Sequence, residues 1–290
     1  MVTTLTTAQP LSDVSPTLLF GQVNDQAWRW LHLEAREQCP FLRDYLPSLP
    51  PEALQAGIAT CSGDVALAQG FEAYELFKRL LGEHGRPLKA SDAVLDFGCG
   101  WGRIIRYFVR DVEPENLWGI DINDAAIEAC RETNRWARFE QINPFPPSRF
   151  EDGTFDLIYA FSVFSHLSEE CHLAWLEEFE RILKPEGVFI STTLPRHFIE
   201  KAGEYAREDP ESLAEWKKHA AESFSPPDEF LAVYDRGEYC FAPISGAGEH
   251  FGFACISRRY MRERWTRHFV LRDRFHWPRL GQTIMVCSKR

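Results

Sequence analysis

The spacing of apolar residues divides the chain into a helical first part and a second part in which short apolar runs alternate with helical segments. Over residues 24–86, apolar side chains recur every three or four positions, which predicts amphipathic helices. The proline-rich stretch "LPSLPPE" separates two of these helices, and Gly82 and Gly85 end the second. We therefore assign residues 16–86 to a helical N-terminal extension and residues 1–15 to a disordered tail.

The pattern changes after residue 87. Five short apolar runs predict strands: "DAVLDFG", "LWGIDIN", "ARFEQIN", "FDLIYAF" and "VFISTTLP". Segments with helical spacing lie between most of them, and this alternation is typical of βαβ units with a parallel sheet. The strands are apolar along most of their length, which indicates a sheet covered by helices on both faces.

The alternation stops after Pro195. Residues 196–256 are rich in acidic and aromatic side chains, and because plain connections are seldom this long, we interpret them as an insertion that covers the active face. The chain then continues with a helix, "RRYMRERWTRHF", and two strands joined by the turn "PRLGQ". Such a hairpin makes the last strand antiparallel to its neighbour. Residues 87–290 are thus predicted to form the core domain, with residues 196–256 inserted in it.

Composition restricts the partners. The 290-residue chain has a formal net charge of −11, which does not suit the phosphate backbone of nucleic acids. No apolar stretch approaches the roughly 20 residues of a membrane span, and the first residues do not resemble a secretory signal. The eight cysteines form no CxxC pair and the nine histidines no HExxH motif. We expect a cytoplasmic protein with reduced thiols and no metal site.

A glycine loop follows the first predicted strand in the stretch "DFGCGWGR". Gly98 and Gly100 would let the backbone approach a ligand, and Gly102 would let the next helix pack closely on the strand. The loop lies at the carboxyl end of a strand and opens a helix, the usual place for a nucleotide-like ligand in an α/β sheet.

Two classes of ligand compete for this loop. The dinucleotide fingerprint has its third glycine three residues after the second, whereas here the spacing is two. Asp96 also precedes the first glycine by two residues, and a carboxylate there suits a cation better than a pyrophosphate. Asp121 ends the second strand, where a carboxylate can accept hydrogen bonds from ribose hydroxyls in either class. The spacing favours a cationic adenosine cofactor over NAD.

At this point the sequence resembles the class I S-adenosylmethionine-dependent methyltransferases. "VLDFGCGWG" is similar to their motif I, and "GIDIN" matches the acid of their second strand. "DGTFDLIYAFSVFSHL" resembles their fourth strand and the loop after it, and "RILKPEGVFISTT" their following helix, turn and fifth strand, with Glu186 where a second glycine is commoner. The resemblance covers about residues 90–194 strongly and the last thirty or so weakly. It implies a Rossmann-like, seven-stranded, mostly parallel sheet with an antiparallel C-terminal hairpin.

The resemblance also implies S-adenosyl-L-methionine as the cofactor and a role for particular residues. Asp121 would hold the ribose, Ile122 would pack on the adenine, and Asn143 would lie near the adenine edge. Phe161 would flank the transferring methyl group. The methionine end of the cofactor would be lined by Asp96, Gly98, Cys99 and Gly100.

Methyl transfer is an in-line displacement, so positioning supplies much of the catalysis, and a base is needed only when the nucleophile loses a proton. His166, just past the fourth strand, is the candidate base, and its alternative role is to cap the next helix or to pack. His250 could reach in from the insertion or be a plain loop histidine.

We expect a small-molecule acceptor, methylated at oxygen. The alternatives are methylation of protein or RNA, an NAD-dependent oxidoreductase, and a non-catalytic cofactor-binding module.

Three further features of the sequence have more than one interpretation. The stretch "NPFPP" is similar to the NPPY/F motif of amino-group methyltransferases, but it precedes the fourth strand instead of following it, so we assign it no such role. The eight arginines from residue 258 to residue 279 could form an RNA-binding face, but Glu263, Asp273 and the acidic net charge favour a solvated helix face; binding of an anionic substrate or an acidic partner is the other alternative. The insertion's aromatic residues wall a substrate pocket or form a small core of their own; they are Tyr234, Tyr239, Phe241, Phe251 and Phe253.

Overall fold

The computed structural model describes residues 14–290, apart from the side chains of Glu37 and Phe41. Most of the tail predicted for residues 1–15 therefore lies outside the described residues. Its last two residues are described: Val14 is buried, and the Ser15 hydroxyl caps the first helix by accepting a hydrogen bond from the backbone N–H of Thr17. The chain divides into two compact units. The first holds residues up to 93 with 100–119 and 123–140, and the second holds residues 94–99, 120–122 and 141–290.

The first unit is mainly helical, although residues 117–119 and 138–140 of this unit belong to strands. The helix expected over residues 25–38 is interrupted by a π-helical turn at Leu31–Ala35. The helix expected after the glycine loop is short, because Gly100 and Gly102 have positive φ angles and the helix begins only at Ile105. The helices of this unit are α1 (Pro16–Phe20), α2 (Asp25–Trp30), α3 (Arg36–Gln38), α4 (Glu52–Ala59), α5 (Gly63–Glu83), α6 (Ile105–Phe108) and α7 (Asp124–Thr133).

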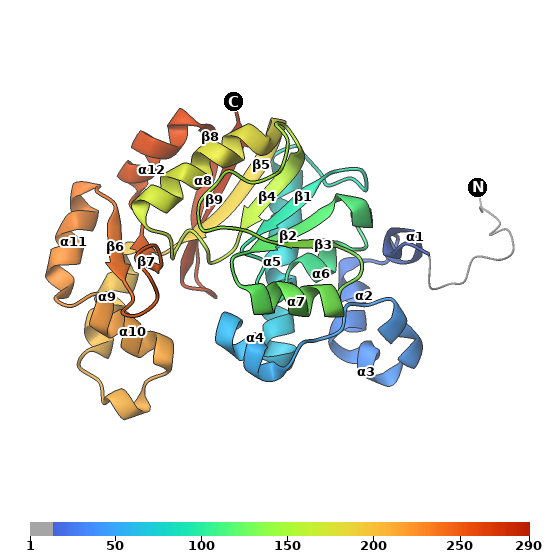
Figure 1. Cartoon of the computed structure of the whole chain (residues 1–290), viewed down its shortest axis with the longest axis horizontal. Helices are drawn as coiled ribbons and strands as arrows, with labels where there is room; N and C mark the ends of the chain where they lie inside the picture. Colours follow the sequence, from blue (N-terminus) through green and yellow to red (C-terminus); the bar gives the residue numbers. More distant parts are fainter. Residues whose placement is uncertain (1–13) are drawn as a thin grey trace, which may run out of the picture. The chain divides into compact units, whose positions relative to one another are not determined.

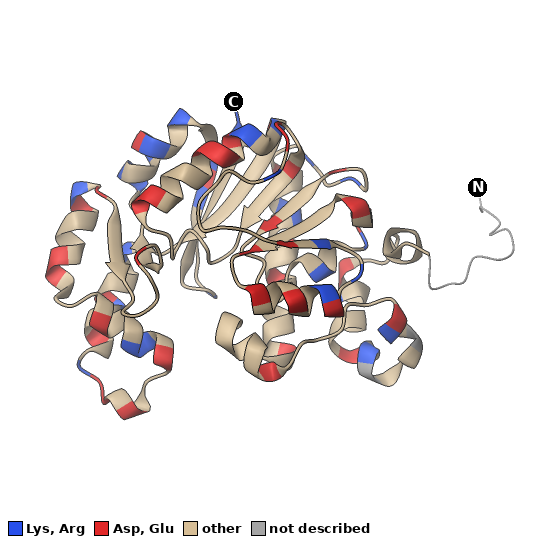
Figure 2. Cartoon of the chain, in the orientation of Figure 1, with Lys and Arg blue, Asp and Glu red and all other residues tan. Residues whose placement is uncertain are grey.

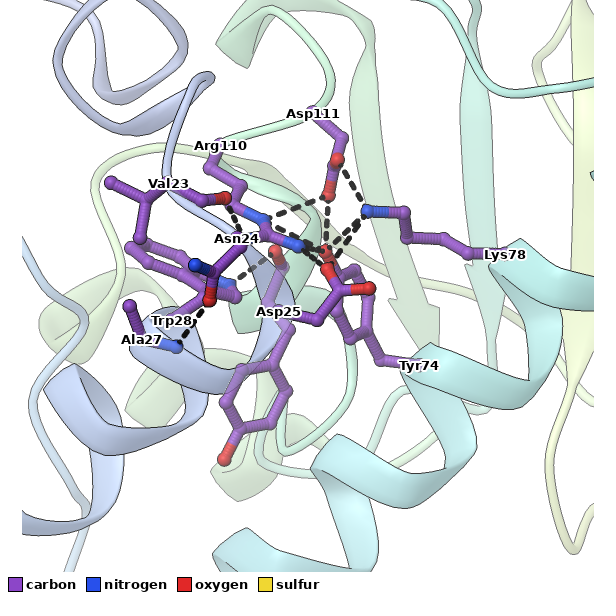
Figure 3. A network of polar contacts seen from close by, with 10 residues as sticks. Val23, Asn24, Asp25, Ala27, Trp28, Tyr74, Lys78, Arg110 and Asp111 are labelled. Carbon is purple, nitrogen blue, oxygen red and sulfur yellow. Dashed lines mark hydrogen bonds and ion pairs between the residues drawn. The ribbon is translucent and has the colours of Figure 1, made fainter.

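A buried polar network joins parts of the first unit that lie far apart in the sequence (Figure 3). Arg110 is 3% exposed and donates hydrogen bonds to the Tyr74 hydroxyl of α5 and to Asp25 of α2. Tyr74 in turn donates to Asp111, which also pairs with Lys78 at 2.8 Å. Two cations thus meet two carboxylates, and a buried charge is tolerated when it is paired in this way. The network holds α2 and α5 against the chain that follows α6.

A seven-stranded sheet has the strand order β3-β2-β1-β4-β5-β9-β8. β1 and β4 are parallel, as are β4 and β5, whereas β9 is antiparallel to both β5 and β8. The seven strands, the antiparallel hairpin and the Rossmann-like class were predicted from the sequence and are confirmed. The strands are β1 (Val94–Phe97), β2 (Leu117–Asp121), β3 (Arg138–Gln141), β4 (Phe155–Ala160), β5 (Leu183–Thr193), β8 (Phe269–Trp277) and β9 (Gln282–Lys289).

Two helices lie side by side on one face of this sheet, α8 (Glu169–Ile182) and α12 (Arg258–Arg264) (Figure 1). The Tyr260 hydroxyl of α12 donates a hydrogen bond to Glu169 of α8 at 2.7 Å. Ser168 caps α8, since its side chain accepts a hydrogen bond from the Cys171 backbone N–H. The cap therefore comes from Ser168 and not from His166.

Residues 196–256 carry three helices and a two-stranded sheet that the sequence did not predict. Figure 1 shows these helices grouped around the two short strands. Phe224 and Phe253 are buried at the centre of a small core, and Tyr234 packs against it. Phe251, by contrast, is 39% exposed. The elements are α9 (Arg196–Tyr205), α10 (Glu215–Ser223), α11 (Pro227–Arg236), β6 (Cys240–Pro243) and β7 (Gly252–Cys255).

Two kinds of feature are absent from residues 14–290. Among residues 14–290, no helix has both the length and the apolar character to cross a bilayer. The same part of the chain contains no group of three or more His, Cys, Asp or Glu side chains arranged to hold a metal ion.

Candidate active site

The loop after β1 is shaped by its glycines. Gly98 has a φ of 69°, and a Cβ there would lie 2.3 Å from Cγ2 of Val163, so another residue would require this part of the site to rearrange. The backbone N–H groups of Gly98 and Cys99 both donate to the carbonyl of Ile120, at 2.8 and 3.0 Å. These two bonds hold the loop against the end of β2. Gly100 opens a segment of the first unit, where it has a φ of 53° and a Cβ would lie 2.7 Å from Cγ2 of Ile58.

Asp96 supplies a buried carboxylate at the end of β1, where it is 2% exposed. Its partner across the sheet is Tyr159 of β4. Burial, together with the charge of Asp96 and a hydrogen bond to it, raises the pKa of Tyr159 well above its ordinary value. The phenol therefore stays protonated beside this buried carboxylate. A buried carboxylate beside a glycine loop suits a cationic group such as an ammonium.

Asp121 and Ile122 follow at the end of β2. The Ile142 N–H donates to the Asp121 carbonyl at 2.9 Å, and the Gln141 side chain donates to the Ile122 carbonyl at 3.2 Å. Ile122 is 51% exposed, which is unusual for a large apolar side chain at the end of a sheet strand. An acid next to an exposed apolar surface fits a ribose and the flat face of an adenine.

Asn143 is exposed and lies in the loop after β3. The carbonyl of the next residue, Pro144, accepts hydrogen bonds from the Trp175 indole at 2.8 Å and from the Cys171 thiol at 3.1 Å. Both donors belong to α8, so this helix fixes the loop.

The second unit thus brings together most of the cofactor residues expected from the sequence, namely Asp96, Gly98, Cys99, Asp121, Ile122 and Asn143. They fit the amino-acid and adenosine parts of S-adenosylmethionine.

The chain turns sharply after β4. Ser162 has a φ of 59°, and its N–H donates to the Thr192 hydroxyl at 2.7 Å. Phe161 is buried and its ring meets that of Trp277 edge-on, with ring centres 6.3 Å apart. A non-glycine residue in this conformation is strained, and such strain is often kept where a site needs it.

Gln282 contacts this turn and was not identified from the sequence. Its amide nitrogen donates to the Ser162 hydroxyl, while its Oε1 atom is buried and has no hydrogen-bond partner among residues 14–290. Buried polar atoms are usually satisfied, so Oε1 is suited to receive a donor from a bound molecule. No local signal marks Gln282, because its position depends on β9 lying between β5 and β8.

His166 lies in the loop between β4 and α8. Its Nδ1 atom is 2.8 Å from the carbonyl oxygen of Gly252. A carbonyl only accepts, so Nδ1 carries the hydrogen and Nε2 of the neutral ring keeps a lone pair. Burial lowers the pKa of His166, and the bond to Gly252 partly opposes that effect. The ring stacks on Phe251 at 5.0 Å. His166 is therefore a neutral histidine in the tautomer that a general base requires.

His250 has a different setting. Its backbone carbonyl accepts a hydrogen bond from the Ser168 N–H at 3.0 Å, and its ring packs edge-on against Phe145. These contacts join the insertion to the start of α8. They give His250 a structural role, in agreement with its interpretation as a plain loop histidine.

Comparisons with known proteins agree with this geometry. Residues 94–187 match a family model described as "Methyltransferase domain". A probable methyltransferase, ltbC, from Aspergillus luteorubrus is 30% identical over 127 residues, which cover 40% of this chain and 45% of that protein. A fatty-acid O-methyltransferase from Mycolicibacterium smegmatis is 33% identical over 113 residues, covering 37% and 39%. The chain thus spans less than half the length of these relatives.

A solved structure shares the fold. The PH0226 protein from Pyrococcus horikoshii OT3 matches with a TM-score of 0.50 and 18% identity, over 76% of this chain and 90% of that one. The antiparallel β9 between β5 and β8 also separates this sheet from the purely parallel order of the classical NAD-binding fold. The glycine loop, the two carboxylates and the sheet order agree with the matched domain: residues 94–187 are similar to the methyltransferase-domain family, in keeping with the resemblance to class I S-adenosylmethionine-dependent methyltransferases.

Proposed function

We propose that this protein transfers a methyl group from S-adenosylmethionine to a hydroxyl oxygen of a small-molecule acceptor, with His166 as the general base. The observation that carries the proposal is the contact between His166 Nδ1 and the Gly252 carbonyl. It fixes the ring so that Nε2 is the free basic atom. An acceptor hydroxyl must lose its proton during methylation, and a neutral imidazole is the side chain best suited to take it near neutral pH.

Each residue has a defined part in this proposal. Asp96 binds the ammonium group of the cofactor, Asp121 accepts from the ribose hydroxyls, and Ile122 covers the adenine. When bound, S-adenosylmethionine supplies an electrophilic methyl group on a positively charged sulfur. An acceptor hydroxyl held beside that methyl group would give up its proton to His166 Nε2 as its oxygen took the methyl group. Because the displacement is in line, positioning provides much of the acceleration.

Contacts between the insertion and the loop after β4 support a small acceptor. The Gly252 N–H donates to the His166 carbonyl at 2.9 Å, and the Ala254 N–H donates to the Ser165 carbonyl at 2.7 Å. Strand β7 therefore lies directly along the loop that carries the proposed base. An acceptor must enter beside this strand, which favours a compact molecule over a folded protein or RNA surface.

All eight cysteines are free thiols, in keeping with the cytoplasmic location that we include in the proposal.

The test is methyl transfer from labelled cofactor to a cell extract that contains small molecules, protein and RNA, comparing the wild type with His166→Gln. Glutamine keeps a donor for the Gly252 carbonyl but has no basic atom. We expect kcat to fall by about 10²- to 10⁴-fold while cofactor affinity is unchanged. His250→Gln is the matched control and should leave kcat within about twofold. The proposal fails if His166→Gln keeps the wild-type rate, or if the label enters only protein or RNA.

A further inference from the structure

A groove lies along one border of the sheet in the second unit. β8 is the last strand in the sheet order, so its outer edge pairs with no strand of the described chain. The groove has a volume of about 400 Å³ and contains part of that edge, Phe269 to Leu271. Val270 is 38% exposed there. An edge strand with unpaired backbone groups can accept an additional strand from another chain.

Arginines of α12 form the other wall of the groove. Arg258 and Arg262 are four residues apart, so they share one face of the helix, and Arg290 lies beside them. Figure 2 shows mostly basic residues along α12, in a chain whose net charge is −11. The groove therefore has a positive rim in an otherwise acidic protein.

The groove arginines differ from their neighbours on the same segment. Arg259 pairs with Glu263 at 2.8 Å, and the Arg267 guanidinium donates to the Glu263 carbonyl. Arg258 and Arg262, in contrast, have no ion pair or hydrogen bond from their side chains to any described residue. Their guanidinium groups are free to bind carboxylates in a bidentate way.

The groove is remote from the proposed active site. Phe269, at the start of β8, pairs with Lys289, whose side chain donates to the carbonyl of Leu183 at the start of β5. The other end of β8 carries Trp277, which touches Phe161. The two sites thus lie at opposite ends of the same strand, so the groove has no part in the methyl transfer proposed above.

We propose that the groove between α12 and the edge of β8 binds an extended acidic peptide of a partner protein as an added strand. The open edge of β8 supplies backbone hydrogen bonds, and Arg258 and Arg262 select acidic side chains at alternate positions. Charges that only protect an edge from aggregation usually lie on the strand itself. β8 carries charges of its own at residues 272–274, but the arginines that line the groove, Arg258 and Arg262, lie on the facing helix across a cavity, which is the arrangement expected of a peptide groove.

The test is fluorescence anisotropy with a labelled synthetic peptide of about ten residues that alternates glutamate and valine. We expect saturable binding that weakens with salt and at least tenfold weaker binding by Arg258→Gln/Arg262→Gln. The matched control, Arg259→Gln/Arg267→Gln, has the same change in charge on the same segment and should bind within twofold of the wild type. Hydrogen exchange should show slower exchange at Val270 and Leu271 when the peptide is bound.

Four results would overturn the proposal. They are no binding by the wild type, equal losses in the two double variants, undiminished binding of a peptide whose alternate amides are N-methylated, and complete displacement of the peptide by an equal concentration of inorganic phosphate. The last result would identify a simple anion site. Since these arginines lie far from the cofactor residues, affinity for S-adenosylmethionine should be the same in all variants and serves as the control for folding.

Discussion

Two histidines are fully buried in very different surroundings. His172 is satisfied at both ring nitrogens: Nε2 accepts from the Trp265 indole at 2.8 Å, and Nδ1 lies 3.2 Å from the Tyr239 hydroxyl. His32 lies between the rings of Trp28 and Tyr107, and neither of its nitrogens has a hydrogen-bond partner among residues 14–290. His172 thus connects two polar side chains by hydrogen bonds, whereas the ring of His32 is packed among aromatic rings without hydrogen bonds to the described residues.

The same substitution should therefore have opposite effects at these positions. His172→Phe leaves the buried Trp265 indole without an acceptor, so we expect the free energy of unfolding to fall by about 2–3 kcal/mol. His32→Phe removes two unsatisfied nitrogens from an aromatic setting, and stability should stay the same or rise by about 1 kcal/mol. Urea unfolding of both variants measures this difference. Equal losses would show that the hydrogen bonds of His172 do not matter.

At the residue scale, the sequence located the cofactor residues better than the acceptor residues. Asp96 and Asp121 lie in the last residues of β1 and β2, Gly98 directly follows β1, and the carboxyl ends of parallel strands meet at one edge, so spacing alone could propose these residues. Gln282 could not be found in this way, because it reaches the Ser162 turn only through the order of β5, β9 and β8. His166 was identified by its place after β4, and the Gly252 contact that defines its tautomer is visible only in the structure.

At the scale of elements, the insertion has a core that can be tested. Phe224 is 1% exposed and contacts the rings of Phe198 and Phe230. Phe224→Ala should lower the free energy of unfolding by about 3–5 kcal/mol, because it opens a cavity in this cluster. Thermal or urea unfolding gives the measurement.

Phe251→Ala is the control from the same insertion. Its side chain is 39% exposed, so the loss of stability should stay below about 1 kcal/mol. Similar losses in the two variants would mean that the insertion has no core of its own around Phe224.

The predicted elements agree with the structure where the pattern is long and regular. The strand β4 (Phe155–Ala160) was recognised at nearly its observed bounds. β6 and β7 were missed because, unlike the equally short β1 and β3, they lie outside the alternation of strands and helices that marks a βαβ fold. β5 begins at Leu183 instead of near Val188. The residues expected to form a turn before Val188 belong to the strand, where the register with β4 shifts between Phe155 and Leu157. These differences depend on pairing with distant segments.

At the scale of the whole molecule, the alternation of strands and helices predicted the α/β class, and the resemblance predicted seven strands with an antiparallel hairpin, whereas the strand order is seen only in the structure. The two compact units of the structure differ from the predicted division into an extension over residues 16–86 and a core domain over residues 87–290. The first unit takes in residues 100–119 and 123–140 together with the N-terminal helices. Tyr107 explains part of this: its hydroxyl donates to the Leu67 carbonyl, and its own carbonyl accepts from the Trp28 indole. Such contacts over long sequence distances carry no local signal.

Acid should destabilise the protein through its buried histidines. Burial lowers the pKa of His172 to about 3 and that of His32 well below its ordinary value, with Arg106 and Arg36 adding to the effect at His32. The unfolded chain binds these protons near pH 6.5 and the folded chain does not. Stability is thus full above about pH 6.5 and falls toward pH 3, by about 1.4 kcal/mol per pH unit for each histidine.

Urea midpoints between pH 7 and pH 4.5 test this dependence. As the pH falls, the free energy of unfolding of the His32→Phe variant should decrease less steeply than that of the wild type. The difference in slope should equal the contribution of one histidine, about 1.4 kcal/mol per pH unit. Parallel curves for the two proteins would mean that His32 takes up a proton equally in the folded and unfolded states.

Calorimetric titration with S-adenosylmethionine and with NAD tests the central claim most directly. We expect the wild type to bind S-adenosylmethionine and not NAD, because Asp96 suits a cationic cofactor. Asp121→Ala should weaken that binding by at least tenfold, because the ribose hydroxyls lose a charged acceptor. Binding of NAD alone, or full affinity for S-adenosylmethionine in Asp121→Ala, would contradict the account.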